Sequence, residues 1–513
     1  MTCSLPLALV AGFAGAQPAP SSVEVGADPA FVTDTADAGP GGPTPVTPEA
    51  DGDPSTTQDP DAGPPGSEKK KRKVAVDRLP IVDADPPLES LPAKRAKPDY
   101  DGRGKEPTTA GDVLLWIPRL LVGPLYLAHE YLIRRPIGAV IMAVERDKLT
   151  QRAIYVFTLG GQKNVGFFPT FFYDFNLLPS AGVYVWWDDA LARKNHVRFH
   201  FGTWGPDWIS TTLTDRYDLS EHSTVSLRAA FSRRSDNLFY GLGPESEQRL
   251  ESRYEAISLD VGPRYDLEVV RGVQLLTAVG VRDTSFGEGT CCESPKLHER
   301  IRAGQLAAPP RLDDGYTFVY QSAGLSLDSR RPRPSQQSGV RLSVSGQPAF
   351  DVSRRPGSSW VKYEGTVGGF WDVTGSARVL SLSVATIFVD PLQGPASTIP
   401  FTELTTLGGF GLMRGFLPGR LVDRSAAVAT LGYQWPIWAF FDGTMQVSAG
   451  NVFGAGLRGF DAGKLRLSTG LGIRSNNSPD HQFEVLAGFG TDTFERGTEI
   501  TSFRLAFGAT RGF

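Results

Sequence analysis

The sequence predicts an all-β protein: a sixteen-stranded antiparallel transmembrane β-barrel that follows short helices and a disordered N-terminal tether. Two observations support this fold class. Apolar and polar residues alternate with a period of two from Leu149 to the end of the chain, as they do in strands with one apolar face. Turn residues divide this region into about sixteen segments, and an even number of strands suits a bacterial barrel.

The alternation is clear within single segments. In residues 340–345, Val and Leu alternate with Arg and Ser, and residues 196–201, 225–232 and 465–474 follow the same pattern. A soluble β-sandwich also alternates, but it rarely contains so many long strands in succession. The pattern therefore favours a barrel with an apolar outer face and a polar lumen.

The expected strands also have an orientation. If the N-terminus lies in the periplasm, odd-numbered strands run outward, and the long connections after the fifth, seventh and eleventh strands are extracellular. The strands are expected to begin near Gly166, Ala181, His196, Trp208, His222, Ser252, Glu268, Tyr316, Ser338, Ser359, Ser376, Ser425, Phe440, Lys464, His481 and Ile500.

The N-terminus has the features of an exported protein. An apolar run over Leu5–Ala14 ends in the small residues Ala14-Gly15-Ala16, which predicts a signal peptide over residues 1–16. The usual positive charge before the apolar run is missing, so a start codon further upstream is the alternative. Export to the bacterial outer membrane is the expected localisation.

Residues 17–111 are expected to form a disordered linker. Gln17–Glu68 contains eleven prolines, ten acidic residues and no Lys or Arg, so it cannot bury enough apolar surface to offset the entropy of folding. The basic run Lys69–Lys73 resembles a nuclear localisation signal, but behind a signal peptide we interpret it as solvated or attracted to anionic lipid. The net charge of −4 also excludes a globally basic nucleic-acid binder.

Residues 112–148 change to a helical pattern, with apolar residues recurring mostly at spacings of three and four. Three prolines divide the stretch, which predicts short amphipathic helices in the periplasm or at the membrane interface. A single transmembrane helix over Val113–Ile133 is the alternative, because that segment is long enough to span a bilayer. The barrel itself is assigned to residues 149–513.

The sequence offers no catalytic motif. None of the six histidines belongs to a Gly-x-Ser-x-Gly elbow or a His-Glu-x-x-His pair. His196 and His200 share a strand face and could bind a metal, but a lumen lining is the favoured interpretation. Cys291 and Cys292 could bind a metal or form a disulfide, but an exposed loop pair without a further role is favoured. We therefore expect no enzyme activity, no metal and no cofactor.

One segment stands out from the alternating pattern. Leu407–Phe416 is dense in glycine, so its backbone can fold back tightly and present Arg414 and Phe416 from a compact loop. The segment lies in the connection after the eleventh expected strand. The last strand is also distinctive, because Phe503, Leu505 and Phe507 alternate with polar or small residues before the terminal Phe513.

From about Asp112 to Phe513 the chain resembles the outer-membrane insertion barrels of the BamA and TamA type, also called bacterial surface antigens. Asn237–Gly243, the two loop motifs Gly408-Gly409 and Met413-Arg414-Gly415-Phe416, and the terminal aromatic residue carry the resemblance. It implies a sixteen-stranded barrel whose first and last strands can part laterally. It further implies that the loop arginine enters the lumen, and that Phe503, Leu505, Phe507 and Phe513 form a barrel insertion signal.

The sequence departs from the family in two respects. Gly432 and Ser448 stand where the family has the acidic partners of the loop arginine, so Arg414 needs another acid or remains hydrated. Candidate acids include Glu364, Glu403, Asp442 and Glu484, and the sequence does not choose among them. The family's periplasmic modules also have no counterpart before the barrel, so client recruitment through them is not expected.

Three functions remain open. The resemblance implies insertion or translocation of proteins or lipids, with the outer-membrane bilayer and nascent outer-membrane proteins or lipids as partners. A passive pore and a structural or surface interaction barrel are the alternatives. Conductance in planar bilayers distinguishes the pore, whereas loss of outer-membrane proteins on depletion supports insertion.

Overall fold

The computed structural model describes residues 131, 135, 156–159, 164–292, 294–330, 338–353, 359–438, 441–475 and 482–511. The expected signal peptide, the expected linker and Phe513 lie outside the described residues. Within the expected helical stretch, Tyr131 and Arg135 are described, both in helical conformation. Of Val113–Ile133, the alternative membrane helix, only Tyr131 belongs to the described residues. Among the described residues, no helix is long and apolar enough to cross a membrane.

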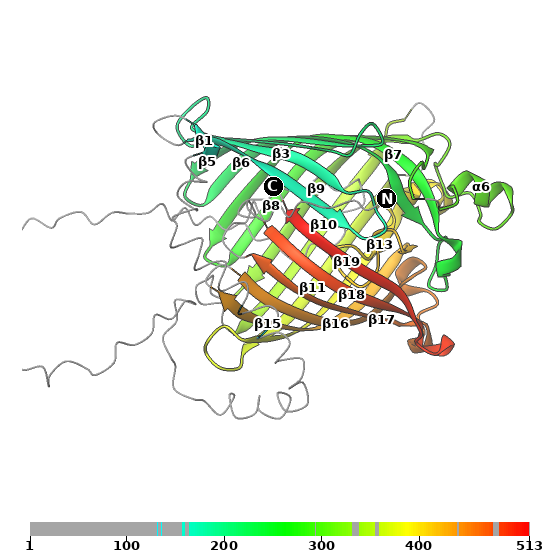
Figure 1. The fold of residues 1–513 in the computed structure, drawn as a ribbon. Helices are drawn as coiled ribbons and strands as arrows, with labels where there is room; N and C mark the ends of the chain where they lie inside the picture. Colours follow the sequence, from blue (N-terminus) through cyan, green and yellow to red (C-terminus); the bar gives the residue numbers. More distant parts are fainter. Residues whose placement is uncertain are drawn as a thin grey trace, which may run out of the picture. The chain divides into compact units, whose positions relative to one another are not determined.

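The described residues form a closed antiparallel barrel of sixteen strands, in which chain neighbours pair and β19 returns to pair with β2 (Figure 1). The predicted fold class is confirmed. The largest difference in strand position is at β8, which begins at Val273 and not near Glu268. The barrel strands are β2 (Val165–Asp174), β3 (Ser180–Asp188), β4 (Asn195–Thr203), β5 (Trp208–Ser220), β6 (Ser223–Phe239), β7 (Ser252–Val270), β8 (Val273–Glu288), β9 (Tyr316–Asp328), β10 (Gly339–Asp351), β11 (Ser359–Asp372), β12 (Val379–Gln393), β15 (Ser425–Trp438), β16 (Phe441–Phe453), β17 (Arg466–Ser475), β18 (Gln482–Thr493) and β19 (Ile500–Arg511).

The alternation in sequence becomes an inside and an outside. On β10, Val340, Leu342 and Val344 are exposed on the outer surface, whereas Arg341 between them is buried. The same arrangement recurs around the barrel, so that most large exposed apolar side chains lie on its outer wall. A soluble protein rarely exposes so much contiguous apolar surface, and this belt is the surface that a bilayer covers.

The long connections gather at one end of the barrel, as expected. They follow β6, β8 and β12, which are the fifth, seventh and eleventh of the sixteen barrel strands and run in the same direction. They comprise residues 240–251, residues 289–315 with α6 (Leu297–Arg302), and residues 394–424. We call residues 394–424 the lumen loop. It contains η4 (Ala396–Thr398), η5 (Phe401–Glu403) and a small hairpin of β13 (Thr405–Leu407) and β14 (Leu421–Asp423). In Figure 1 this loop-bearing end is marked by α6.

An apolar core fills the loop-bearing end. Phe401 of the lumen loop contacts the rings of Phe239, Tyr254 and Phe286 at centroid distances of 5.1 to 5.4 Å. Fifteen buried apolar residues from the barrel wall and the long loops form this cluster. Burial of aromatic side chains is a large source of stability, so the first half of the lumen loop is fixed inside the barrel mouth.

Candidate functional site

The glycine-dense part of the lumen loop forms a compact tip, residues 408–420. Gly408 and Gly409 have φ angles of 116° and 72°, which favour glycine, and their amides donate to the Leu412 and Phe416 carbonyls, each at 2.9 Å. Met413 has a φ of 60°, in the left-handed region that non-glycine residues seldom enter. The tip therefore folds back on itself and directs Arg414 toward the barrel wall.

Arg414 meets one of the four acids that the sequence left open. Its Nη2 donates to Glu484 Oε2 on β18 at 2.6 Å, and both side chains are buried. The other three candidates have different partners: Glu403 accepts from Tyr316, Asp442 from Gln434 and Glu364 from Ser345. Ser448, one of the two positions where the sequence lacks the acid that the resemblance implies, is hydrogen-bonded to Thr430.

Gly415 lies flat against the inner wall. Its amide donates to Ser468 Oγ on β17 at 2.8 Å, and its carbonyl accepts from Ser502 Oγ on β19 at 2.9 Å. A Cβ at Gly415 would collide with the Phe489 carbonyl of β18, so glycine is required by this close approach. This single residue thus contacts three successive strands, through hydrogen bonds to β17 and β19 and through a close backbone approach to β18.

Phe416 completes the contact. Its ring is fully buried and lies over Gly490 of β18, where a Cβ would overlap the ring. Gly488 lies two residues before Gly490 on the same face of β18, and its lack of a side chain leaves room for the Gly415 backbone. Two wall glycines and the loop glycine therefore form a matched surface.

The barrel closes at a short seam, the junction of β2 and β19. Within the described residues, its register contains three residue pairs, Ala506 with Asp174, Phe507 with Tyr173 and Gly508 with Phe172. The neighbouring junctions β2–β3 and β18–β19 have eight and ten pairs. Among the described barrel strands, the seam has the fewest paired residues, and one further backbone hydrogen bond, from the Phe175 amide to the Leu505 carbonyl at 2.8 Å, crosses it. A two-residue strand, β1 (Thr158–Leu159), also pairs with β2 at Gly166 and Val165.

Three of the four residues expected to form the insertion signal lie on the outer face at this seam, and the fourth, Phe513, lies outside the described residues. Phe503, Leu505 and Phe507 are all exposed on the outer wall. Phe507 contacts the rings of Phe171 and Tyr173 on β2, at 5.4 and 6.0 Å between centroids. Their proposed role in insertion remains a prediction, but their place is the lipid-facing edge of the last strand.

Inside the lumen, Arg504 of β19 crosses the seam to Asp174 of β2. Its Nε lies 3.0 Å from both carboxylate oxygens and its Nη2 lies 2.7 Å from Oδ2, and both side chains are fully buried. Nη1 donates to the Gly409 carbonyl and, at 3.2 Å, to the Arg414 carbonyl. The Arg504 guanidinium also lies 4.1 Å from the centre of the Phe410 ring.

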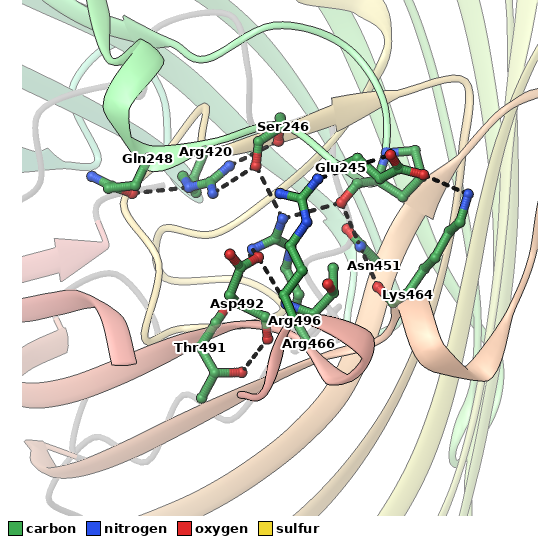
Figure 2. Close-up of polar contacts among 12 residues, drawn as sticks. Glu245, Ser246, Gln248, Arg420, Asn451, Lys464, Arg466, Thr491, Asp492 and Arg496 are labelled. Carbon is green, nitrogen blue, oxygen red and sulfur yellow. Dashed lines mark hydrogen bonds and ion pairs between the residues drawn. The ribbon is translucent and has the colours of Figure 1, made fainter. Parts of the chain in front are cut away.

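A second anchor holds the far side of the loop tip (Figure 2). Arg420 donates to Gln248 Oε1, Ser246 Oγ and the Ser246 carbonyl at 2.8 to 3.0 Å. Arg466 of β17 donates to the same Ser246 carbonyl at 3.0 Å and pairs with Asp492 at 2.8 Å. The connection 240–251 is thereby tied to the lumen loop.

Burial, followed by repulsion from Arg466, lowers the pKa of Arg420 to about 10. The guanidinium nevertheless stays charged at neutral pH. Within the described part of the chain, its acceptors are amide, hydroxyl and carbonyl oxygens and include no carboxylate. This anchor therefore depends on the backbone of 240–251 holding its place over the loop.

The histidines found by sequence do not form a site together. His196 lies between Asp188 and Asp218, at 2.7 and 3.1 Å, whereas His200 is within 3.4 Å of Thr170. Among the described residues, no group of three His, Cys, Asp or Glu side chains could hold a metal ion. Cys291 and Cys292 are joined by a disulfide in the connection 289–315.

Sequence reasoning missed Asp174, Phe410 and the role of Arg504. A signal for the pair was present, because Asp174 and Arg504 carry opposite charges on the lumen-facing positions of the first and last strands. Barrel closure makes those strands neighbours. Phe410 gave no signal, since an aromatic residue in a loop has many uses.

No protein-family model matches the sequence, and no curated protein matches it. Among solved structures, the chain is similar to BamA from Haemophilus ducreyi lacking POTRA domains 1–3, with a TM-score of 0.48 and 12% identity over 67% of this chain and 70% of that one. It is also similar to CdiB from Acinetobacter baumannii, with a TM-score of 0.42 and 9% identity over 67% and 59% of the two chains. CymD, a monoaromatic hydrocarbon channel, has a TM-score of 0.30 and 12% identity over 60% and 82%. At these values the similarity does not bear on function, and the fold rests on the strand pairing itself.

Proposed function

We propose that this protein is an outer-membrane barrel that inserts or translocates proteins or lipids through the seam between β2 and β19. The single observation that carries the proposal is the seam's short register of three residue pairs, combined with a loop tip that touches the lumen side of both strands. An ordinary closed barrel gains stability from full pairing at every junction. A weak junction between the first and last strands is useful where the wall must part.

The exposed edge at the seam suggests the kind of client. Between the three pairs with β19 and the two-residue contact with β1, the edge of β2 that faces β19 offers backbone groups for an incoming strand. A client strand with alternating apolar and polar residues would match both the lipid and the lumen. The outer-membrane bilayer is the primary partner, and nascent outer-membrane proteins or lipids are the proposed clients.

A passive pore is less well supported. The apolar core around Phe401 fills the loop-bearing end. The loop tip lies inside the lumen, against the inner face of β17, β18 and β19. An open pore needs a continuous polar channel. We therefore expect low conductance from the wild-type protein in planar bilayers.

The proposal is tested by locking the seam. In a background with serine at Cys3, Cys291 and Cys292, Tyr173→Cys with Phe507→Cys places a cysteine pair across the seam. Oxidation is expected to reduce insertion of an unfolded eight-stranded outer-membrane protein into vesicles to the protein-free rate, because the two strands can no longer part. Reductant should restore it. The measured quantity is the rate at which the client becomes protease-resistant.

The matched control shares one of the two cysteines. Val485→Cys with Phe507→Cys locks β18 to β19, a junction that the proposal does not require to open. This lock should leave the insertion rate unchanged. Equal insertion by the oxidised and reduced seam variants would show that clients do not pass through this seam.

A further inference from the structure

Arg504 uses its whole guanidinium for two partners that belong to different parts of the molecule. Nε and Nη2 hold Asp174 across the seam, whereas Nη1 holds the Gly409 and Arg414 carbonyls of the loop tip. The side chain is fully buried, as is Asp174. A buried guanidinium that loses part of this shell is strongly disfavoured, because neither water nor another partner replaces it at once.

The loop tip also touches β2, so it spans the seam. The Phe410 ring meets Phe172 of β2 at 5.6 Å, and it lies against the guanidinium groups of Arg504 and Arg414 at 4.1 and 5.7 Å. On the other side, Ser502 of β19 donates to the Gly415 carbonyl. Withdrawal of the tip therefore removes contacts from both seam strands, and parting of the strands removes contacts from the tip.

We propose that Arg504 couples the lumen loop to the seam, so that a seated loop tip and a closed seam form one state, and a released tip and an open seam form the other. Arg504 acts as a positioning residue: it holds Asp174 and the loop carbonyls in one arrangement. The use of this coupling for insertion rests on the proposed function, whereas the coupling itself is measurable without a client.

The closest test changes the seam and measures the loop. Asp174→Asn removes the carboxylate on β2, while the structure shows no direct hydrogen bond from the Asp174 side chain to the loop tip among the described residues. Loop release is measured as maleimide alkylation of Met413→Cys, a position that is fully buried when the tip is seated. Since breaking a buried ion pair shifts equilibria strongly, we expect alkylation to rise about tenfold or more. Native cysteines are serine in all proteins compared.

Seam closure is measured in parallel as the yield of the Tyr173→Cys and Phe507→Cys disulfide. Asp174→Asn and Arg504→Gln should each lower this yield and raise loop alkylation together. The exchange of Asp174→Arg with Arg504→Asp should separate the two readouts, because it restores an ion pair across the seam but removes the donor to the Gly409 and Arg414 carbonyls. Seam closure should then recover while alkylation stays high.

The matched control is Ser343→Ala, a lumen-facing change on β10, remote from the seam in the strand order. It should leave both readouts at the wild-type value. Every variant is measured on the folded form, identified by faster migration on an unheated gel. The coupling would be overturned if Asp174→Asn lowered the yield of the seam disulfide but left Met413→Cys protected from alkylation. It would also be overturned if the exchange variant restored both the disulfide yield and the protection of Met413→Cys. Neither result depends on insertion, so the coupling and the proposed function can fail separately.

Discussion

Gly415→Ala is expected to drive the loop tip away from the barrel wall. The new Cβ would collide with the Phe489 carbonyl, which is backbone of β18 and cannot rotate away. The tip must therefore give up the hydrogen bonds to Ser468 and Ser502. We expect new protease cleavage in residues 408–420 of the folded protein and a higher conductance in planar bilayers, because the lumen is less obstructed.

The control for this variant is Gly346→Ala. Gly346 lies on β10, where an added Cβ meets no atom within 4 Å and no positive φ is required. This protein should match the wild type in protease resistance and conductance. Wild-type behaviour of Gly415→Ala as well would mean that the tip does not lie against β18 in the membrane.

Arg414→Gln is expected to lower both folded yield and stability. It leaves Glu484 buried without its cationic partner, and breaking a buried ion pair in this way costs about 3–5 kcal/mol. The loss should appear as a lower denaturant midpoint for the change from the fast to the slow gel form. Arg414→Met combined with Glu484→Leu should recover part of the stability, since no buried charge is left unpaired.

An exposed ion pair supplies the control. Arg249 pairs with Glu247 at the surface of the connection 240–251. Solvent screens the attraction between these two side chains, so Arg249→Ala should barely move the midpoint. Equal midpoints for Arg414→Gln and the wild type would show that the Glu484 contact does not stabilise the barrel.

Much of the fold was predictable because its signal is local. In each strand, alternating apolar and polar residues mark the outer and inner faces, as in residues 340–345. Turn residues mark the connections between strands. The even strand number and the position of the long connections follow from those two signals. The start of β8 was misplaced because Glu268–Val270 continues the β7 pattern up to a turn at Arg271 and Gly272.

The site was less predictable because its contacts join distant segments. The sequence suggested Glu484 as one of several possible acids for Arg414 and left hydration open, and choosing Glu484 required knowing where the tip lies against β18. The Arg504–Asp174 pair depends on the register at barrel closure, which no local pattern sets. Arg420 was missed for a further reason: its acceptors among the described residues are uncharged, and two of them belong to Ser246.

Three anchors hold the lumen loop inside the barrel, unlike a simple connection between two strands. Glu403 accepts from Tyr316 at 2.7 Å in the barrel mouth, Arg414 pairs with Glu484 at the wall, and Arg420 is held by the connection 240–251. Each anchor involves a buried charge with specific partners. Such sites favour one position of the loop over many, although their net contribution to stability is smaller than their number suggests.

Hydrogen exchange of the protein in lipid nanodiscs tests the central claim, that the seam is the junction that opens. Peptides from β2 and β19 should exchange faster than peptides from β15 and β16. Those two strands pair almost continuously, from the pair of Ser425 with Phe453 to the pair of Trp438 with Phe441. Oxidation of the cysteine pair at Tyr173 and Phe507 should remove the difference. Equal protection of β2, β19, β15 and β16 in the unlocked protein would contradict a seam that parts, and with it the proposed route for clients.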